Sequence, residues 1–129
     1  MKEIQKNDII IKNLTKSEKK MKLNAKRIEK QTKKIKINCL ESIDSTNKKA
    51  ILLAQNGAEE GTAVTAIYQT AGKGQRGNIW ESEKGKNLLF SVVLRLDVQA
   101  YDQFVISQMA SLAVVDLLGE HDIEAKIKW

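Results

Sequence analysis

The sequence has very few of the residues that bind metals or form disulfides. It contains a single histidine, His121, and a single cysteine, Cys39. Two such residues cannot supply an intramolecular disulfide or the four ligands of a structural zinc site. No apolar run approaches the length of a membrane-spanning helix, and the N-terminus carries charges where a signal peptide would be apolar. We therefore expect no metal site, no membrane segment and a cytoplasmic location.

Proline is also absent, and aromatic residues make up only 5% of the 129 residues, whereas 42% are hydrophobic. This length and composition are compatible with one globular domain of ordinary size. Cys39 lies in the apolar stretch IKINCL, which favours a small buried residue over a reactive thiol.

Positive charge is concentrated near the N-terminus. Residues 1–36 contain 13 Lys/Arg and 4 Asp/Glu, or +9, whereas residues 37–129 contain 9 and 12, or −3, and the total is +6. We interpret residues 1–36 as a basic, disordered tail, with a weakly amphipathic helix over residues 14–28 as the alternative. The tail has too few apolar positions for a helix-turn-helix, so nucleic acid is not an expected partner. A nucleic-acid-binding module that acts through this tail is kept as a rival function.

From residue 34 onward the hydrophobic pattern predicts alternating strands and helices. The expected strands are residues 35–42, 62–70, 88–96 and 123–129, and the expected helices are residues 43–57 and 100–121. Asp44 or Ser45 can cap the first helix, and Gly57 can end it. The nearly continuous apolar run at 88–96 indicates a central strand buried on both faces. The second helix is expected in the core.

Residues 71–87 (AGKGQRGNIWESEKGKN) predict a long polar loop of the kind that compact domains keep for function. Gly72, Gly74 and Gly77 spell GxGxxG, a spacing that lets backbone N–H groups approach a phosphate. A dinucleotide-binding turn is excluded because no helix follows, a kinase loop because HRD and DFG are absent, and a Walker A loop because Gly72-Lys73 precedes glycine. From the glycines alone, a plain surface loop is an equally good interpretation.

The residues around these glycines favour a nucleotide. Lys73, Arg76 and Lys86 add positive charge that can neutralise a triphosphate. Trp80 adds an aromatic ring that can cover an adenine, although an ordinary core tryptophan is a competing interpretation.

The order of these motifs resembles the biotin protein ligase family. The segments ESIDSTN, YQTAGKGQRGNIWES and GKNLLFSVVL, a long helix and KIKW follow one another over residues 37–129 with the spacing of that family. The combination is specific, because the STN triplet, the glutamine before the glycine loop, the tryptophan after it and the KW end must all coincide. Residues 1–36 carry no such resemblance.

The resemblance implies an α/β (α+β) fold, in which packed helices cover a mixed sheet, related to class II synthetases. It implies that biotin attacks the α-phosphate of MgATP to give biotinyl-AMP, and that a lysine of a biotin carboxyl-carrier protein then takes the biotin. Biotin, ATP and Mg²⁺ are the expected substrates and cofactors, and the homodimer is one option for the assembly. Lipoate ligase shares the fold and the adenylation chemistry and is the alternative, but GKGQRGNIW looks more like the biotin enzymes.

The resemblance also assigns the biotin pocket. Ser45, Thr46 and Asn47 would hydrogen-bond the ureido ring of biotin, with Gln69 along the same pocket. Buried hydrogen bonds to a planar urea would orient it and reject analogues that leave the donors unpaired. Considered apart from the family, Ser45 is as well explained as a helix cap.

The loop over biotinyl-AMP would comprise Gly72, Lys73, Gly74, Gln75, Arg76 and Gly77, with Trp80 beside the nucleotide. The family usually has arginine at positions 73 and 75. Lys73 keeps the charge without the bidentate fork, whereas Gln75 loses the charge. We expect this loop to retain the acyl-adenylate less well.

The family lysine that contacts biotin and the α-phosphate would lie beyond Trp129, and the KWPND motif is present only as KW. We therefore expect residues 37–129 to be the N-terminal part of a truncated catalytic domain. No catalytic residue is assigned within the chain, and turnover by it is expected to be negligible.

Overall fold

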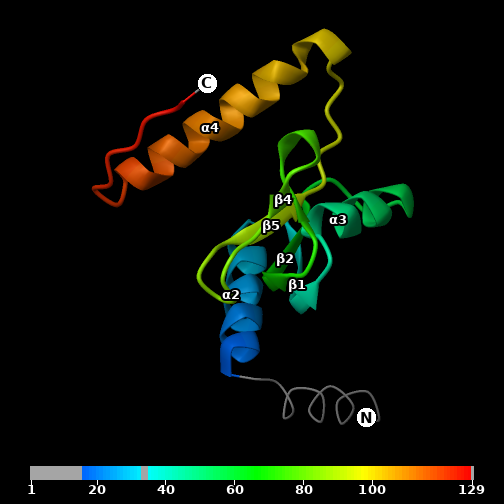
Figure 1. Cartoon of the computed structure of the whole chain (residues 1–129), viewed down its shortest axis with the longest axis vertical. Coiled ribbons are helices and arrows are strands. Elements are labelled where there is room, and N and C mark those ends of the chain that lie inside the picture. The colour runs from blue at the N-terminus through cyan, green and yellow to red at the C-terminus, as the bar shows by residue number, and fades with distance from the viewer. Residues whose placement is uncertain (1–15, 33–34, 129) are drawn as a thin grey trace. The chain divides into compact units, whose positions relative to one another are not determined.

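The computed structural model describes residues 16–32 and 35–128, which form two compact units that divide between Arg95 and Leu96. The first unit contains a three-stranded sheet, two helices and a small hairpin, and the second is built on one long helix (Figure 1). The sheet contains both parallel and antiparallel pairs. The predicted fold class, α/β with a mixed sheet, is confirmed.

The sheet has the order β1-β2-β5, with β1 at Lys36–Ile43, β2 at Thr62–Gln69 and β5 at Leu89–Val92. β1 runs parallel to β2, and β5 runs antiparallel to it. The central strand is therefore β2, and Val64 within it is fully buried. The prediction that residues 88–96 form the central strand was wrong.

Only one face of β5 is buried. Leu89 and Val93 are buried, whereas Phe90, Val92 and Leu94 are exposed. Successive side chains of a strand point to opposite faces. Among the described residues of the first unit, a helix packs against β5 only on the face that carries Val93. The expected burial on both faces is therefore not observed.

Helix α3 (Thr46–Gln55) packs on the face of the sheet that carries Val64 and Val93. Its Ala50 packs with Val64 and Val93 in the core, and Leu40, Leu53 and Ala54 surround them. Ser45 caps the helix, as one predicted option had it, and Gly57 follows the helix with a φ of 84°, as expected for a left-handed stop. At the same end the Arg95 guanidinium donates hydrogen bonds to the carbonyl oxygens of Ala54 and Ala58.

Helix α2 (Lys16–Thr32) lies within the segment that the charge pattern predicts to be disordered. Its Ala25 is buried at 7% exposure, and the Glu29 carboxylate accepts a hydrogen bond of 2.6 Å from the backbone N–H of Ile37 in β1. Residues 16–32 thus form a helix where the charge pattern predicts a disordered tail, because lysine-rich sequence without glycine or proline forms a helix readily once one face can pack. Residues 1–15 lie outside the described part.

The two helices of the first unit pack on opposite faces of the sheet. Leu40 of β1 packs in the α3 cluster, whereas its neighbour Cys39 contacts the carbonyl oxygen of Met21 in α2. Adjacent residues of a strand point to opposite faces, so β1 is covered on both sides (Figure 1). Burial, and secondarily the charge of Glu29, raises the pKa of the half-buried Cys39 thiol.

Part of the predicted loop at 71–87 is regular. β3 (Gly72–Lys73) and β4 (Ile79–Trp80) form an antiparallel hairpin, closed by a short 3₁₀ turn, η1, at Gln75–Gly77. Two-residue strands are too short to produce a readable alternation, so the pattern missed them.

The second unit contains the 3₁₀ turn η2 (Ala100–Asp102) and helix α4 (Gln103–Gly119). The helix is present as predicted, but none of its residues is buried, so its prediction as a core helix is not borne out. Residues 123–128 form no strand, because no described segment pairs with them. Among the described residues, no helix is long and apolar enough to cross a membrane.

Candidate functional site

A pocket of about 450 Å³ opens at the start of α3. The residues that line it come from the first turns of α3, the end of β2, the hairpin strand β3 and the middle of β5. They are Ser45, Thr46, Asn47, Lys48, Ile51, Gln69, Lys73 and Ser91.

The parallel pairing of β1 and β2 places these segments together. Ile43 at the end of β1 pairs with Gln69 at the end of β2, so the turn from β1 into α3 starts beside Gln69. The backbone N–H of Ala71 then donates to the carbonyl oxygen of Asp44 over 2.9 Å. This bond fixes the base of the hairpin against the start of α3.

Thr46 and Gln69 form the centre of a polar network inside the pocket. The Gln69 Oε1 atom accepts hydrogen bonds from the backbone N–H of Thr46, at 2.7 Å, and from its hydroxyl, at 2.9 Å. The Thr46 hydroxyl also lies 2.9 Å from the Ser91 hydroxyl. Thr46 is only 4% exposed, so these bonds are shielded from bulk water.

The start of α3 is held by a second set of polar contacts. Ser45, 6% exposed, accepts a long hydrogen bond of 3.4 Å at Oγ from the backbone N–H of Lys48. The Asp44 carboxylate accepts from the backbone N–H of Ser45 and pairs with the Lys48 ammonium at 2.8 Å. The hydrogen bond from Lys48 lowers the pKa of Asp44, and the same bond raises the pKa of Lys48. Lys48 therefore stays protonated and is paired with Asp44.

The glycines of the hairpin allow its two strands to approach closely. A Cβ atom at Gly72 would lie 2.5 Å from the carbonyl oxygen of Trp80 and 3.1 Å from Nε2 of Gln69. A Cβ atom at Gly74 would lie 3.3 Å from the carbonyl oxygen of Asn78, which accepts the Gly74 N–H at 2.7 Å. Two of the three glycines in the GxGxxG pattern thus have a structural reason inside the hairpin itself.

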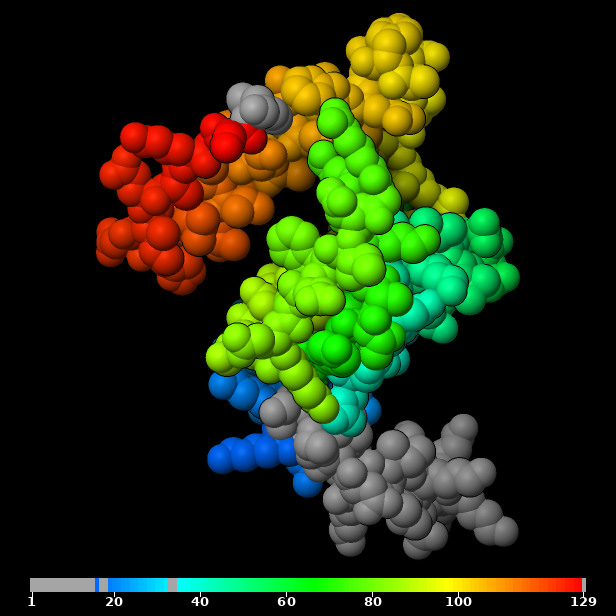
Figure 2. Space-filling view, viewed as in Figure 1, coloured from blue at the N-terminus to red at the C-terminus, as the bar shows by residue number. Residues whose placement is uncertain are grey.

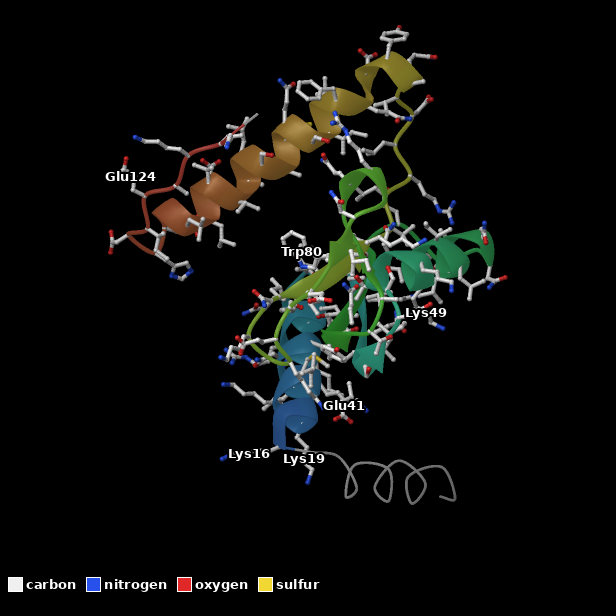
Figure 3. The ribbon with its side chains drawn as sticks, in the orientation of Figure 1. Lys16, Lys19, Glu41, Lys49, Trp80 and Glu124 are labelled. Carbon is white, nitrogen blue, oxygen red and sulfur yellow. The ribbon has the colours of Figure 1, made fainter. Side chains whose placement is uncertain are left out.

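The tip of the hairpin is exposed and projects from the first unit (Figure 2). Arg76 adopts the left-handed conformation, with a φ of 55°, and Gly77 follows with a φ of 82°. Trp80, labelled in Figure 3, is 59% exposed. Trp80 is therefore not a core residue of the first unit.

The sequence model of the biotin/lipoate A/B protein ligase family matches residues 39–129. This chain belongs to that family. The match starts inside β1 and includes every segment that lines the pocket.

Individual relatives agree with the family match. The chain is 39% identical over 88 residues to the bifunctional ligase/repressor BirA of Bacillus subtilis, covering 67% of this chain and 27% of that protein. It is 33% identical over 109 residues to the protein of the same name from Escherichia coli, covering 83% and 33%. It is 36% identical over 85 residues to human biotin–protein ligase, covering 60% and 12%. The chain thus spans a third or less of the length of these relatives.

Five residues assigned through the family motifs line the same pocket: Ser45, Thr46, Asn47, Gln69 and Lys73. Six others belong to the hairpin but do not line it: Gly72, Gly74, Gln75, Arg76, Gly77 and Trp80. The hairpin turns sharply after Lys73, so only its first strand reaches the cavity.

Three lining residues were not predicted from the motifs: Lys48, Ile51 and Ser91. Lys48 and Ile51 follow the STN triplet at helical spacing, so the periodicity of α3 could have found them. Ser91 is the single hydroxyl residue in the apolar run LLFSVVL, and that exception was the available signal.

Among residues 16–32 and 35–128, no group of three His, Cys, Asp or Glu side chains could hold a metal ion. The carboxylate nearest the pocket wall, Asp44, is paired with Lys48. These residues do not fit a magnesium ion held by the protein alone.

Proposed function

We propose that this chain provides the biotin side of a biotin protein ligase. The observation that carries the proposal is the joining of the STN triplet, Gln69 and Lys73 in one pocket of a chain from this family. The reaction would join biotin and MgATP into biotinyl-AMP and then transfer the biotin to a lysine of a carboxylase carrier protein. A relative named biotin–protein ligase supports biotin rather than lipoate as the substrate.

The pocket chemistry suits a small planar urea with an apolar chain. Ser45 and Asn47 provide hydroxyl and amide groups at the start of α3, and Gln69 provides a second amide opposite them. Ile51, one helical turn further, offers apolar surface for the rest of the ligand. We infer that the polar end of the pocket orients the urea and the apolar end faces the valeryl chain.

Lys73 would act on the phosphate side. It lines the pocket and forms no ion pair with any residue that the structure describes, whereas Lys48 is paired with Asp44. Attack on the α-phosphate brings a carboxylate toward a polyanion, and a nearby ammonium group lowers that repulsion. Arg76 and Trp80 would contribute if the hairpin folds over the nucleotide, and Gln75 adds no charge there.

Substitution of Asn47 tests the biotin site. We expect Asn47→Ala to weaken biotin binding about tenfold, which corresponds to the loss of roughly one polar hydrogen bond. Isothermal titration of the purified chain with biotin measures the affinity. Asn56→Ala is the matched control, because Asn56 follows the same helix at its other end and interacts through its backbone.

Two results would contradict the proposal at different levels. Asn47→Ala with unaltered affinity would remove Asn47 from the site but leave the family function standing. A folded, unaltered chain that binds neither biotin nor biotinyl-AMP would overturn the proposed function itself.

A further inference from the structure

The hydrogen bonds around Gln69 have a direction that one backbone group determines. The backbone N–H of Thr46 can only donate, and it lies 2.7 Å from the Gln69 side chain. The atom that receives it must therefore be the carbonyl oxygen Oε1 and not the amide nitrogen. The orientation of the Gln69 amide follows from chemistry alone.

The same reasoning extends to Ser91. Because Oε1 only accepts, the Thr46 hydroxyl, 2.9 Å away, must donate its proton to it. That proton is then not available to Ser91, so the Ser91 hydroxyl donates to Thr46 Oγ1 across 2.9 Å. The donors run in one direction, from Ser91 to Thr46 and on to Gln69.

This chain of bonds leaves the Gln69 amide nitrogen for a ligand. Both hydrogen bonds from Thr46 are made to Oε1, and Nε2 forms no hydrogen bond with a described residue. Nε2 lies beside Gly72, where an added Cβ would be 3.1 Å away, and Gln69 lines the pocket. The N–H donors of Nε2 are therefore not engaged by any described residue, in a side chain that lines the pocket.

We propose that Ser91 is a positioning residue that sets the ligand specificity of the pocket through Gln69. By donating to Thr46 Oγ1, the Ser91 hydroxyl keeps the Thr46 hydroxyl donating to Gln69 Oε1. The Gln69 amide is then fixed by two hydrogen bonds and offers only N–H donors to the ligand. The pocket then requires a hydrogen-bond acceptor, such as the oxygen of a urea, at this point. This assignment of the ligand rests on the proposed function, whereas the orientation of Gln69 does not.

The sequence around Ser91 supports a functional role for its hydroxyl. Its neighbours on the same face of β5, Leu89 and Val93, are both buried and apolar. An apolar residue between them would extend the core, yet the strand places a hydroxyl there, and this hydroxyl pairs with that of Thr46. Without that donor, Thr46 Oγ1 would lack its partner in a position that water reaches poorly.

The first experiment observes Gln69 without any ligand. In the ¹⁵N–¹H spectrum of the full chain, we expect Ser91→Ala to shift the two side-chain N–H signals of Gln69, because one of the two bonds to Oε1 loosens. Ser91→Thr keeps the hydroxyl and should restore them. Unmoved Gln69 signals in a folded Ser91→Ala protein would overturn the inference whether or not biotin binds.

The second experiment measures specificity by titration with biotin and with 2-iminobiotin, in which an imine N–H replaces the urea oxygen. Ser91→Ala should weaken biotin binding about 5- to 20-fold and narrow the preference for biotin over the imino analogue. In a Gln69→Ala background the same change should have less than a twofold effect, because Ser91 acts through Gln69.

The outcomes separate the two proposals. An equal loss of biotin affinity from Ser91→Ala in the unaltered chain and in the Gln69→Ala background would indicate a general structural role. It would contradict the proposal that Ser91 positions Gln69. Shifted Gln69 signals together with no biotin binding by any variant would overturn the proposed function and leave the positioning of Gln69 supported.

Discussion

Among single residues, Gly72 shows that close approach of two backbone segments determines the form of the site. Gly72 pairs with Trp80 across the hairpin, and no side chain fits between them. The same residue borders Gln69, so the hairpin and the polar network share one tightly packed position. A change at Gly72 should therefore affect folding of the hairpin and binding together.

We expect Gly72→Ala to lower the free energy of unfolding by about 1–3 kcal/mol, because the added Cβ meets backbone that cannot move aside cheaply. Biotin affinity should fall as well. Urea unfolding followed by circular dichroism measures the first effect, and titration measures the second. Gly119→Ala is the control, because a Cβ atom there meets nothing within 4 Å. Equal stability of the two variants would contradict the packing argument.

At the level of secondary structure, the two helices of the first unit pack on the sheet through different kinds of contact. α3 contributes Ala50 to an apolar cluster, whereas α2 is held by Ala25 and by the Glu29 contact to β1. The exposed residues of α2 are mostly cationic; Lys16 and Lys19 are labelled in Figure 3. Because so few apolar residues attach α2, one substitution in its buried face should release it.

We expect Ala25→Asp to detach α2 from β1, because a carboxylate without a partner is costly to bury. Trypsin should then cut within residues 16–32 much faster than in the unaltered chain, and mass spectrometry of the fragments would locate the cuts. Asn24→Asp, at the exposed neighbouring position, adds the same charge and should change little. Rapid cleavage of the unaltered chain at these lysines would instead support the disordered tail that the composition predicts.

For the chain as a whole, binding of biotin and its activation by ATP require different groups. The pocket and all of its lining residues lie in the first unit. Of the two lysines that line the pocket, Lys48 is paired with Asp44, whereas Lys73 forms no ion pair with a described residue. The resemblance implies a further lysine that acts on biotin and the α-phosphate, and no residue of the pocket is assigned that role. We therefore expect this chain to bind biotin more readily than it activates it.

Biotin-dependent ATP–pyrophosphate exchange measures activation directly. For the purified 129-residue chain we expect exchange at least about a hundredfold slower than for a full-length relative of the family, because loss of one preorganised donor has effects of that order. Titration of both chains with biotin is the control for binding. Exchange at similar rates would show that residues 1–129 already contain the required groups.

The elements whose signal is local could be predicted from the sequence alone. Alternation predicted β1 and β2, helical spacing and a capping residue predicted α3, and the ordered motifs indicated the family. Which strand is central depends on packing in three dimensions, because the apolar run at 88–96 does not reveal how many of its faces are covered. The contact between Ser91 and Thr46 also depends on strand pairing, because the lone hydroxyl in the apolar run marks Ser91 but does not reveal its partner 45 residues away. The packing of α2 depended in the same way on a partner, β1, because a helix with so few apolar residues is stable only where a surface receives them.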